Sequence, residues 1–346
     1  MNKKLIALAV AAAASTTSAT AAEIAKNDNA SLEMGGRVEA RLSLKDNKVE
    51  DKSRVRLNFL GKTEITDELY GLGFYEGEFK AYSEKNDFDK DIHTSNNDSI
   101  EHRYAFAGIG GNFGEVTFGT VKGSLQAVTD FTDIMAYHGN TAAPKVNAAD
   151  RPDRSVAYAG TFGDFEARAN YTFGSSVKPN SDKSSWEKDN NGGYALSGIY
   201  NIGETGARVT AAYAAQDESA TKSVKEFMLG ASYEFDAFYV AGLYTNIDNQ
   251  EDGANNGSKG DGYELAAAYT MGQAKFTTTY NRLNNKSNAA NSDSEVEKDN
   301  IAVDATYFFN DNFRSYVSYN FNLLDSDKVG KLGAQNEAVL GLRYDF

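Results

Sequence analysis

The strongest constraint on this chain is an alternation of apolar and polar residues that recurs along it and continues to its last residue. In the final segment, "NEAVLGLRYDF", apolar side chains occupy every second position: Ala338, Leu340, Leu342, Tyr344 and Phe346. Arg343 and Asp345 stand between them. The same period of two appears in "LEMGGRVEARLSL", "FEARANYTF", "FMLGASYEF" and "IAVDATYFF". Successive side chains of a strand point to opposite faces, so each segment predicts a strand with one apolar and one polar face.

A secreted β-sandwich or β-helix would also alternate, but further features favour a barrel in a membrane. The mean hydropathy of -0.53 is too low for a helical membrane protein. Arg and Glu stand in mid-strand on the polar faces, where a sandwich core could not accept them. The apolar faces end repeatedly in aromatic residues, as in the girdles of membrane barrels: Tyr158, Tyr171, Phe173, Tyr200, Tyr213, Tyr233, Tyr269, Tyr280, Tyr307, Tyr319 and Tyr344.

Short and long connections alternate along the chain. The short ones are 66–68, 110–114, 162–165, 202–206, 235–238, 271–274 and 309–313. The long ones are 45–51, 82–99, 122–150, 175–189, 217–222, 248–260, 285–298 and 325–335. They predict an all-β fold, a 16-stranded antiparallel transmembrane β-barrel with strands of about ten residues and both termini on the periplasmic side. A barrel of this size leaves an aqueous channel.

Residues 1–22 have the features of a secretory signal peptide. Lys3 and Lys4 precede a short apolar run, and Ala19-Thr20-Ala21 fits a cleavage site. This predicts export across the inner membrane and a barrel domain spanning 23–346. Without the two lysines, 33 basic residues stand against 49 acidic ones, a net charge of −16. Such an acidic chain argues against nucleic acid as a partner.

Residues 122–150 form the longest connection, and it is too apolar to remain in solvent. Val128, Phe131, Ile134, Met135 and Tyr137 all require burial. We expect this third long loop to fold into the barrel and narrow the pore, the alternative being a compact surface loop.

One predicted strand, "YGLGFYEGEF", has an unusually bare outward face. Its outward residues are Gly71, Gly73, Tyr75, Gly77 and Phe79. Such a face contacts lipid poorly but lets another protein surface approach closely. It predicts a subunit interface and therefore an oligomer.

Taken with these features, the chain resembles the Gram-negative general porins, in particular the OmpU-type outer-membrane porins. The resemblance covers the whole mature chain through "LEMGGRVEARLSLKD", "SRVRLNFLGKTEI", "YGLGFYEGEF", "RYAFAGIGGNFGEVTFG", "DFTDIMAYHGNTAA", "NFRSYVSYNFNLLDSDKVGK" and "LGLRYDF". It implies a homotrimer with the third loop folded into each pore. It also implies that Tyr344 and Phe346 belong to a signal read by the outer-membrane assembly machinery. Whether residues 23–30 enter the pore stays open.

In general porins, basic residues on the pore wall face acidic residues on the third loop. The resemblance places the basic wall at Arg37, Arg56, Arg103 and Arg151, and the strand alternation independently turns these four inward. They could also simply pair with carboxylates of the wall. The acidic candidates on the loop are Asp130 and Asp133. The chain departs from the enteric branch at 136–140, where the usual loop carboxylate is absent, so Glu76 and Glu78 are alternative sources of the negative side.

The sequence gives no reason to expect an enzyme, a metal site or a cofactor. The chain has no Cys and three histidines, His93, His102 and His138, and none stands in a recognisable nucleophile arrangement. The expected partners are copies of the chain, outer-membrane lipid and lipopolysaccharide, the assembly machinery, and small hydrophilic solutes and ions.

We therefore expect a general diffusion porin of the outer membrane. The acidic loops predict a moderate preference for cations that weakens at high salt. One alternative is a structural or adhesive barrel whose loops bind a host or a phage. Another is a substrate-specific channel, although the expected inward residues include no aromatic track.

Overall fold

The computed structural model describes residues 21–81, 100–174, 178–179, 186–187, 192–219, 221–251, 257–288 and 294–346. The predicted signal peptide lies outside these residues except for Ala21 and Ala22. His93, the predicted loop 82–99 and most of the predicted loop 175–189 also lie outside them.

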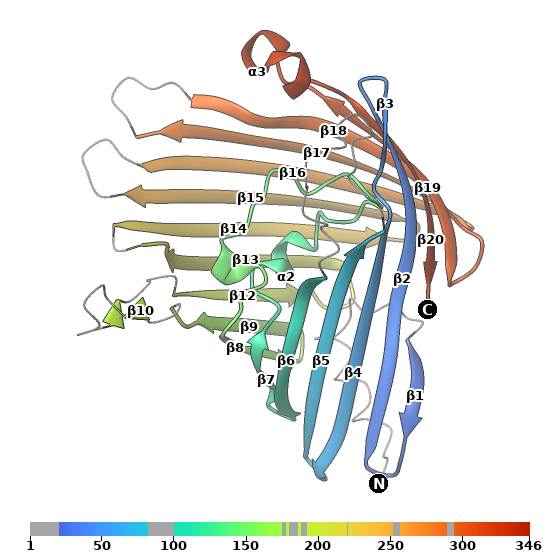
Figure 1. Ribbon diagram of the computed structural model, residues 1–346, viewed down its shortest axis with the longest axis vertical. Helices are drawn as coiled ribbons and strands as arrows, with labels where there is room; N and C mark the ends of the chain where they lie inside the picture. Colours follow the sequence, from blue (N-terminus) through green and yellow to red (C-terminus); the bar gives the residue numbers. More distant parts are fainter. Residues whose placement is uncertain are drawn as a thin grey trace, which may run out of the picture.

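The described residues form a closed 16-stranded antiparallel β-barrel, as the alternation predicts (Figure 1). Its wall strands are β2 (Ala30–Lys45), β3 with β4 (Lys48–Asp51, Arg54–Thr66), β5 (Leu69–Lys80), β6 (Glu101–Gly111), β7 (Gly114–Thr120), β8 (Ser155–Phe162), β9 (Phe165–Thr172), β12 (Gly193–Asn201), β13 (Ala207–Asp217), β14 (Lys222–Phe235), β15 (Phe238–Glu251), β16 (Gly257–Met271), β17 (Ala274–Ser287), β18 (Ser294–Phe308), β19 (Phe313–Asn322) and β20 (Glu337–Asp345). A separate small hairpin consists of β10 (Lys178–Pro179) and β11 (Trp186–Glu187).

The first and last wall strands close the barrel. Strand β2 pairs with β4 on one side and with β20 on the other, from Arg37↔Asp345 to Lys45↔Glu337. The backbone N–H of Gly36 donates to the Phe346 carbonyl at 2.9 Å, and the Phe346 N–H donates to the Gly36 carbonyl at 3.1 Å. Closure leaves no sheet edge along this seam, which a lipid environment requires.

A short additional strand, β1 (Ala22–Lys26), extends the seam beyond the end of β20. It pairs with β2 between Ser31 and Met34, on the same side of β2 as β20, and all five residues are exposed. Residues 22–26 therefore lie along the wall.

The prediction of a long loop at 45–51 is wrong. A two-residue turn, Asp46-Asn47, connects β2 directly to β3. Both turn residues have positive φ values, 51° and 58°, which Asp and Asn tolerate and tight hairpin turns require. The predicted loop 217–222 is also short, because β13 ends at Asp217 and β14 begins at Lys222.

The seven short turns lie where the sequence predicts them, but the strands from β14 to β18 are longer than expected, with 14 or 15 residues each. They continue into the predicted loops 248–260 and 285–298. Strands can continue to pair through their backbones beyond the lipid, where apolar side chains are not needed. The start of a polar stretch in the sequence therefore does not show where a strand ends.

The lipid-facing surface confirms the predicted alternation. On β20, Leu340, Leu342 and Tyr344 are 47%, 51% and 48% exposed, whereas Val339 is fully buried. Aromatic rings line the short-turn end, for example in the contacts of Phe235 with Tyr233 and Phe238. This is the outer surface of a protein embedded in a bilayer.

The segment between β7 and β8 contains the short helices α2 (Gln126–Thr129) and η1 (Asn147–Ala149). Its residues Leu125 and Val128 pack against Ala195, Ala214 and Met228, which point away from the lipid on β12, β13 and β14. Figure 1 shows α2 at mid-height of the barrel, within the ring of strands.

A further helix, α3 (Ser326–Gly333), follows β19 and is capped by Asp325, whose side chain accepts from the Asp327 N–H. No helix among the described residues is long and apolar enough to cross a membrane.

Candidate functional site in the barrel lumen

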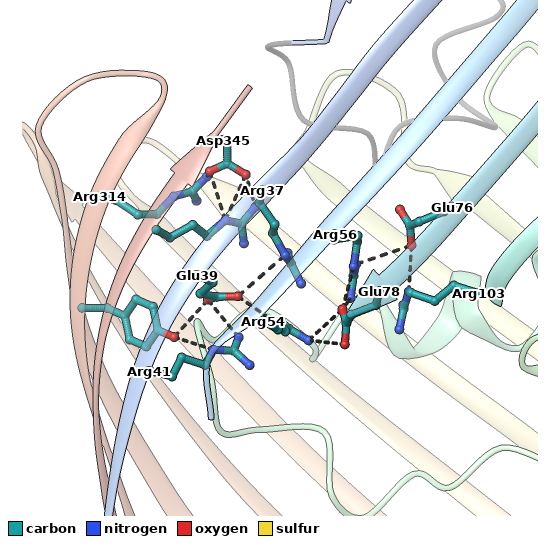
Figure 2. Close-up of polar contacts among 12 residues, drawn as sticks. Arg37, Glu39, Arg41, Arg54, Arg56, Glu76, Glu78, Arg103, Arg314 and Asp345 are labelled. Carbon is teal, nitrogen blue, oxygen red and sulfur yellow. Dashed lines mark hydrogen bonds and ion pairs between the residues drawn. The ribbon is translucent and has the colours of Figure 1, made fainter. Parts of the chain in front are cut away.

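A band of charged side chains crosses the inner wall from β19 to β6, and we call it the arginine ladder (Figure 2). Direct cross-strand neighbours on this face include Arg37↔Arg56, Glu39↔Arg54 and Arg56↔Glu78. The ladder contains seven arginines, Arg37, Arg41, Arg54, Arg56, Arg103, Arg314 and Arg343, and four carboxylates, Glu39, Glu76, Glu78 and Asp345.

Glu39 is the centre of one half of the ladder. Its buried carboxylate lies 2.8 Å from Arg41 Nη2, 3.0 Å from Arg54 Nε and 3.7 Å from Arg37 Nε. The Tyr316 hydroxyl donates to it at 2.9 Å. Arg37 Nε is buried without a hydrogen-bond partner, so this guanidinium is the least satisfied of the group.

Glu76 and Glu78 hold the other half. Arg103 Nε donates to Glu76 at 2.7 Å, Arg56 Nη1 lies 3.6 Å from Glu76, and Arg56 also bonds to Glu78. The two glutamates thus lie within the ladder itself and partly neutralise it. Among the predicted acidic residues, only Asp130 and Asp133 lie on a different element from the ladder.

Three of the four predicted basic residues, Arg37, Arg56 and Arg103, lie together in the ladder. Arg151 lines the same cavity but forms its ion pairs outside the ladder. Its guanidinium is 3.2 Å from Glu101 and 3.5 Å from Asp150, at the end of the segment that precedes β8. Four arginines of the ladder were not among the predicted basic wall: Arg41, Arg54, Arg314 and Arg343. The first two share the strand alternation of Arg37 and Arg56, which could have revealed them.

Asp130 and Asp133 line the same cavity as the ladder, and its volume is about 920 Å³. Asp130 is paired with Lys122 at 3.2 Å. The Asp133 side chain is exposed to the lumen, yet loss of hydration within the barrel raises its pKa, an effect that nearby Lys145 opposes. The cavity lining contains eight arginines and three lysines against two glutamates and four aspartates.

Wall carboxylates hold the backbone of the segment 122–150. The N–H groups of Ala136, Ala142 and Val146 donate to Asp304, Glu264 and Glu226 at 2.7, 2.9 and 3.0 Å. Similar bonds join Ala148 N–H to Gln216 and Ser124 N–H to Asn170. These acceptors come from five strands, β9, β13, β14, β16 and β18, so they fix the path of the segment over a large part of the wall.

Apolar contacts also hold the same segment, and only their partners on the wall were not anticipated. The inner wall was expected to be polar, but Ile199, Met228, Leu243 and Ala266 are buried against segment residues such as Phe131. Met228 and Leu243 interrupt the polar alternation of their strands, which is the signal in the sequence that they face a packed surface.

The described residues contain no group of three or more His, Cys, Asp or Glu arranged to hold a metal ion. His102 lies on the outward side of β6, with Nδ1 3.0 Å from the Tyr75 hydroxyl. The charged lumen is suited to guiding ions and polar solutes.

Comparison with known proteins defines the class. The model of the Gram-negative porin family matches residues 7–327, and the chain belongs to this family. Its relatives include outer membrane protein U of Vibrio parahaemolyticus, 48% identical, and of Vibrio vulnificus, 50% identical, each alignment covering all of both chains. Porin-like protein L of Photobacterium profundum is 44% identical over the same extent.

Solved structures share the fold at low identity. OmpF of Salmonella typhi, in complex with daunomycin, has a TM-score of 0.77 and 22% identity, over 94% of this chain and all of that one. An anion-selective porin from Comamonas acidovorans has a TM-score of 0.69 and 17% identity, over 92% of this chain and all of that one. The protein is thus an OmpU-type general diffusion porin of the outer membrane, and its family and relatives are channels rather than enzymes.

Proposed function

We propose that the segment 122–150 forms the constriction of the pore and that permeating ions pass between it and the arginine ladder. The observation that supports this is the single cavity lined by Arg37, Arg56 and Arg103 together with Asp130 and Asp133. The hydrogen bonds from Ala136, Ala142 and Val146 to wall carboxylates hold the segment in this position.

The channel prefers cations moderately in this proposal, and two opposing effects set the preference. The net charge of −16 expected after signal-peptide removal attracts cations to the mouths over a Debye length of about 8 Å at physiological salt. The cavity lining has more basic than acidic residues and opposes this. Because salt screens the mouths more than partly buried charges, the cation preference decreases as salt concentration rises. The similarity to an anion-selective porin concerns the fold alone, so it does not predict the ion selectivity of this channel.

The assembly is a homotrimer in this proposal, with β4, β5 and β6 at the interface. Gly61, Gly73 and Ala107 are direct cross-strand neighbours on the outward face, and a Cβ atom added at Gly73 would meet no atom within 4 Å. The outward face of these three strands therefore has a row of small side chains that another subunit could approach closely. A trimer form has been solved for OmpT of Vibrio cholerae. Native mass measurement in detergent tests the proposal, and a purely monomeric protein would overturn it.

The signal peptide 1–22 is removed on export in this proposal, and Tyr344 with Phe346 directs assembly. Edman sequencing of the mature protein should begin at Glu23.

The decisive experiment is single-channel recording in a planar lipid bilayer under a potassium chloride gradient. Three equal conductance steps and a reversal potential of cation sign support an open trimeric pore. Silence from correctly folded protein would favour a structural or adhesive barrel instead. A conductance that saturates with one solute class would favour a substrate-specific channel.

A further inference from the structure

Tyr316 reaches the arginine ladder by crossing a neighbouring strand. It lies on β19, and its direct cross-strand neighbour on β20 is Gly341, whose own neighbour on β2 is Arg41. The three residues therefore form one row across the seam where the barrel closes. Tyr316 and Arg41 both line the cavity of the lumen. The tyrosine ring can span the middle strand only if that strand leaves room for it.

Gly341 leaves this room. A Cβ atom added at Gly341 would lie 2.1 Å from Cζ of the Tyr316 ring and 2.4 Å from its Cε1. No side chain fits between the ring and the backbone of β20, so the ring lies directly on the glycine. The Tyr316 side chain is almost fully buried there, with an exposed fraction of 4%. This position brings its hydroxyl to the side chains of β2.

The Tyr316 hydroxyl both accepts and donates a hydrogen bond on β2. It accepts from Arg41 Nε at 2.8 Å and donates to Glu39 Oε1 at 2.9 Å. Arg41 Nη2 lies 2.8 Å from the same carboxylate oxygen. The three side chains therefore form a closed triangle, in which the tyrosine holds the guanidinium and the carboxylate side by side.

The triangle keeps the Arg41 charge away from ions in the lumen. The Arg41 side chain is only 9% exposed, and its guanidinium stands 5.0 Å from the centre of the Tyr137 ring on the segment 122–150. A positive charge in contact with a carboxylate has much of its field cancelled at a distance. The position of this guanidinium therefore affects how strongly the ladder repels cations.

The same arrangement occurs a second time, away from the ladder. Tyr70 on β5, Gly110 on β6 and Glu115 on β7 are also direct cross-strand neighbours in one row. The Tyr70 hydroxyl donates to Glu115 at 2.8 Å, and a Cβ atom added at Gly110 would lie 2.2 Å from Cζ of the Tyr70 ring. Of the described residues that line the cavity, none belongs to this second row. Tyr70 is therefore a matched control for Tyr316.

We propose that Tyr316 is a positioning residue for the arginine ladder. Through its hydroxyl it holds the Arg41 guanidinium beside Glu39 and out of the path of permeating ions. Gly341 makes this possible by letting the ring cross β20. The inference rests on the proposed passage of ions beside the ladder, and it assigns to an uncharged side chain an effect on ion selectivity.

Reversal potentials under a potassium chloride gradient test the proposal. Tyr316→Phe keeps the ring on Gly341 and removes only the hydroxyl, so Arg41 Nε loses its acceptor and the guanidinium can turn toward the ions. We expect the cation-to-anion permeability ratio to fall about twofold, equivalent to about 0.4 kcal/mol. Gly341→Ala displaces the ring and should change the ratio in the same direction. Tyr70→Phe should leave the ratio as in the wild type.

A double-mutant cycle shows whether the effect acts through Arg41. Arg41→Gln removes a positive charge and should raise the cation preference. Adding Tyr316→Phe to Arg41→Gln should then have no further effect. A Tyr316→Phe channel with the wild-type ratio would overturn the proposal, and so would a decrease that persists in the Arg41→Gln background.

Two further outcomes are distinguishable. If Arg41→Gln and Arg37→Gln both leave the ratio unchanged, the proposed passage of ions beside the ladder fails. If they change it and Tyr316→Phe does not, only the positioning role fails. Heat-dependent gel mobility verifies that each barrel is folded. Failure of Tyr316→Phe to fold, while Tyr70→Phe folds, would assign the hydroxyl to barrel closure and refute a role in selectivity.

Discussion

Arg37 and Arg56 are direct cross-strand partners on the inner face of β2 and β4, two positive side chains placed opposite each other. Like charges in this position ordinarily destabilise a sheet. Here Glu39 stands beside Arg37, and Glu76 and Glu78 hold Arg56 (Figure 2). The carboxylates thus allow guanidinium groups to gather on one side of the lumen.

Arg37→Gln should increase the preference for cations and leave the barrel folded. The side chain has an unpartnered Nε and faces Arg56, so little favourable interaction is lost. A unit charge about 7 Å from an ion in water contributes about 0.6 kcal/mol, which corresponds to a change of two- to threefold in the permeability ratio. Reversal potentials under a potassium chloride gradient measure it. Arg314→Gln, farther along the ladder, is the comparison. An unchanged permeability ratio in both variants would show that the charges of the ladder do not influence the permeating ions.

Asp130→Asn/Asp133→Asn should have the opposite effect and reduce the cation preference by a similar factor. Both residues line the same cavity as the ladder, and the change removes two negative charges with little change in side-chain volume. The control Asp153→Asn alters an exposed aspartate after the segment and should leave the ratio as in the wild type. Equal reversal potentials in all three proteins would mean that the acidic assignment is wrong.

Acid should also reduce the cation preference. The reduction should begin at a higher pH than it would if Asp133 titrated like an ordinary aspartate. Loss of hydration raises the pKa of Asp133, so as pH falls its negative charge is lost at a higher pH than that of an ordinary aspartate. Reversal potentials measured from pH 7 down to pH 4 follow this loss. In Asp133→Asn the decrease in cation preference at the higher pH values should be absent. If cation preference depends on pH in the same way as in the wild type, another group is responsible.

Gly36→Ala should destabilise the closed barrel by roughly 1–3 kcal/mol, the cost of an overpacked contact. An added Cβ would lie 2.4 Å from the Arg56 carbonyl oxygen and 2.9 Å from the Phe346 ring. The control Gly242→Ala places a methyl group on another wall strand, with its nearest contact at 3.4 Å. Urea unfolding in detergent, followed by gel mobility, compares the two, and equal midpoints would exclude a tightly packed seam.

Phe346→Ala separates the seam from the proposed assembly signal. If the ring is read by the assembly machinery, the variant should be scarce in the outer membrane but fold normally from urea into detergent. Poor folding in detergent would instead show that packing of Phe346 on Gly36 is its main role.

Much of the charged wall could be found from the sequence because strand alternation fixes the side of every residue. Arg37, Arg56, Glu76 and Glu78 all point inward as expected. What alternation cannot give is the register between strands. Register makes Glu78 the direct cross-strand neighbour of Arg56, so that the two form an ion pair. Arg151 lies outside the strands, where alternation gives no information, and its ion pair is with Glu101.

The sequence by itself determined the barrel, its strand number, its short turns and its lipid-facing surface, because a side-chain period of two and the apolarity of lipid act locally on each strand. The path of the segment 122–150 was decided only in the tertiary structure. Its contacts join Leu125 to Met228, Ala142 to Glu264 and His138 to Ser318, pairs that are far apart in the chain. Such contacts depend on how the closed wall brings distant strands around one loop, and no local pattern encodes that arrangement.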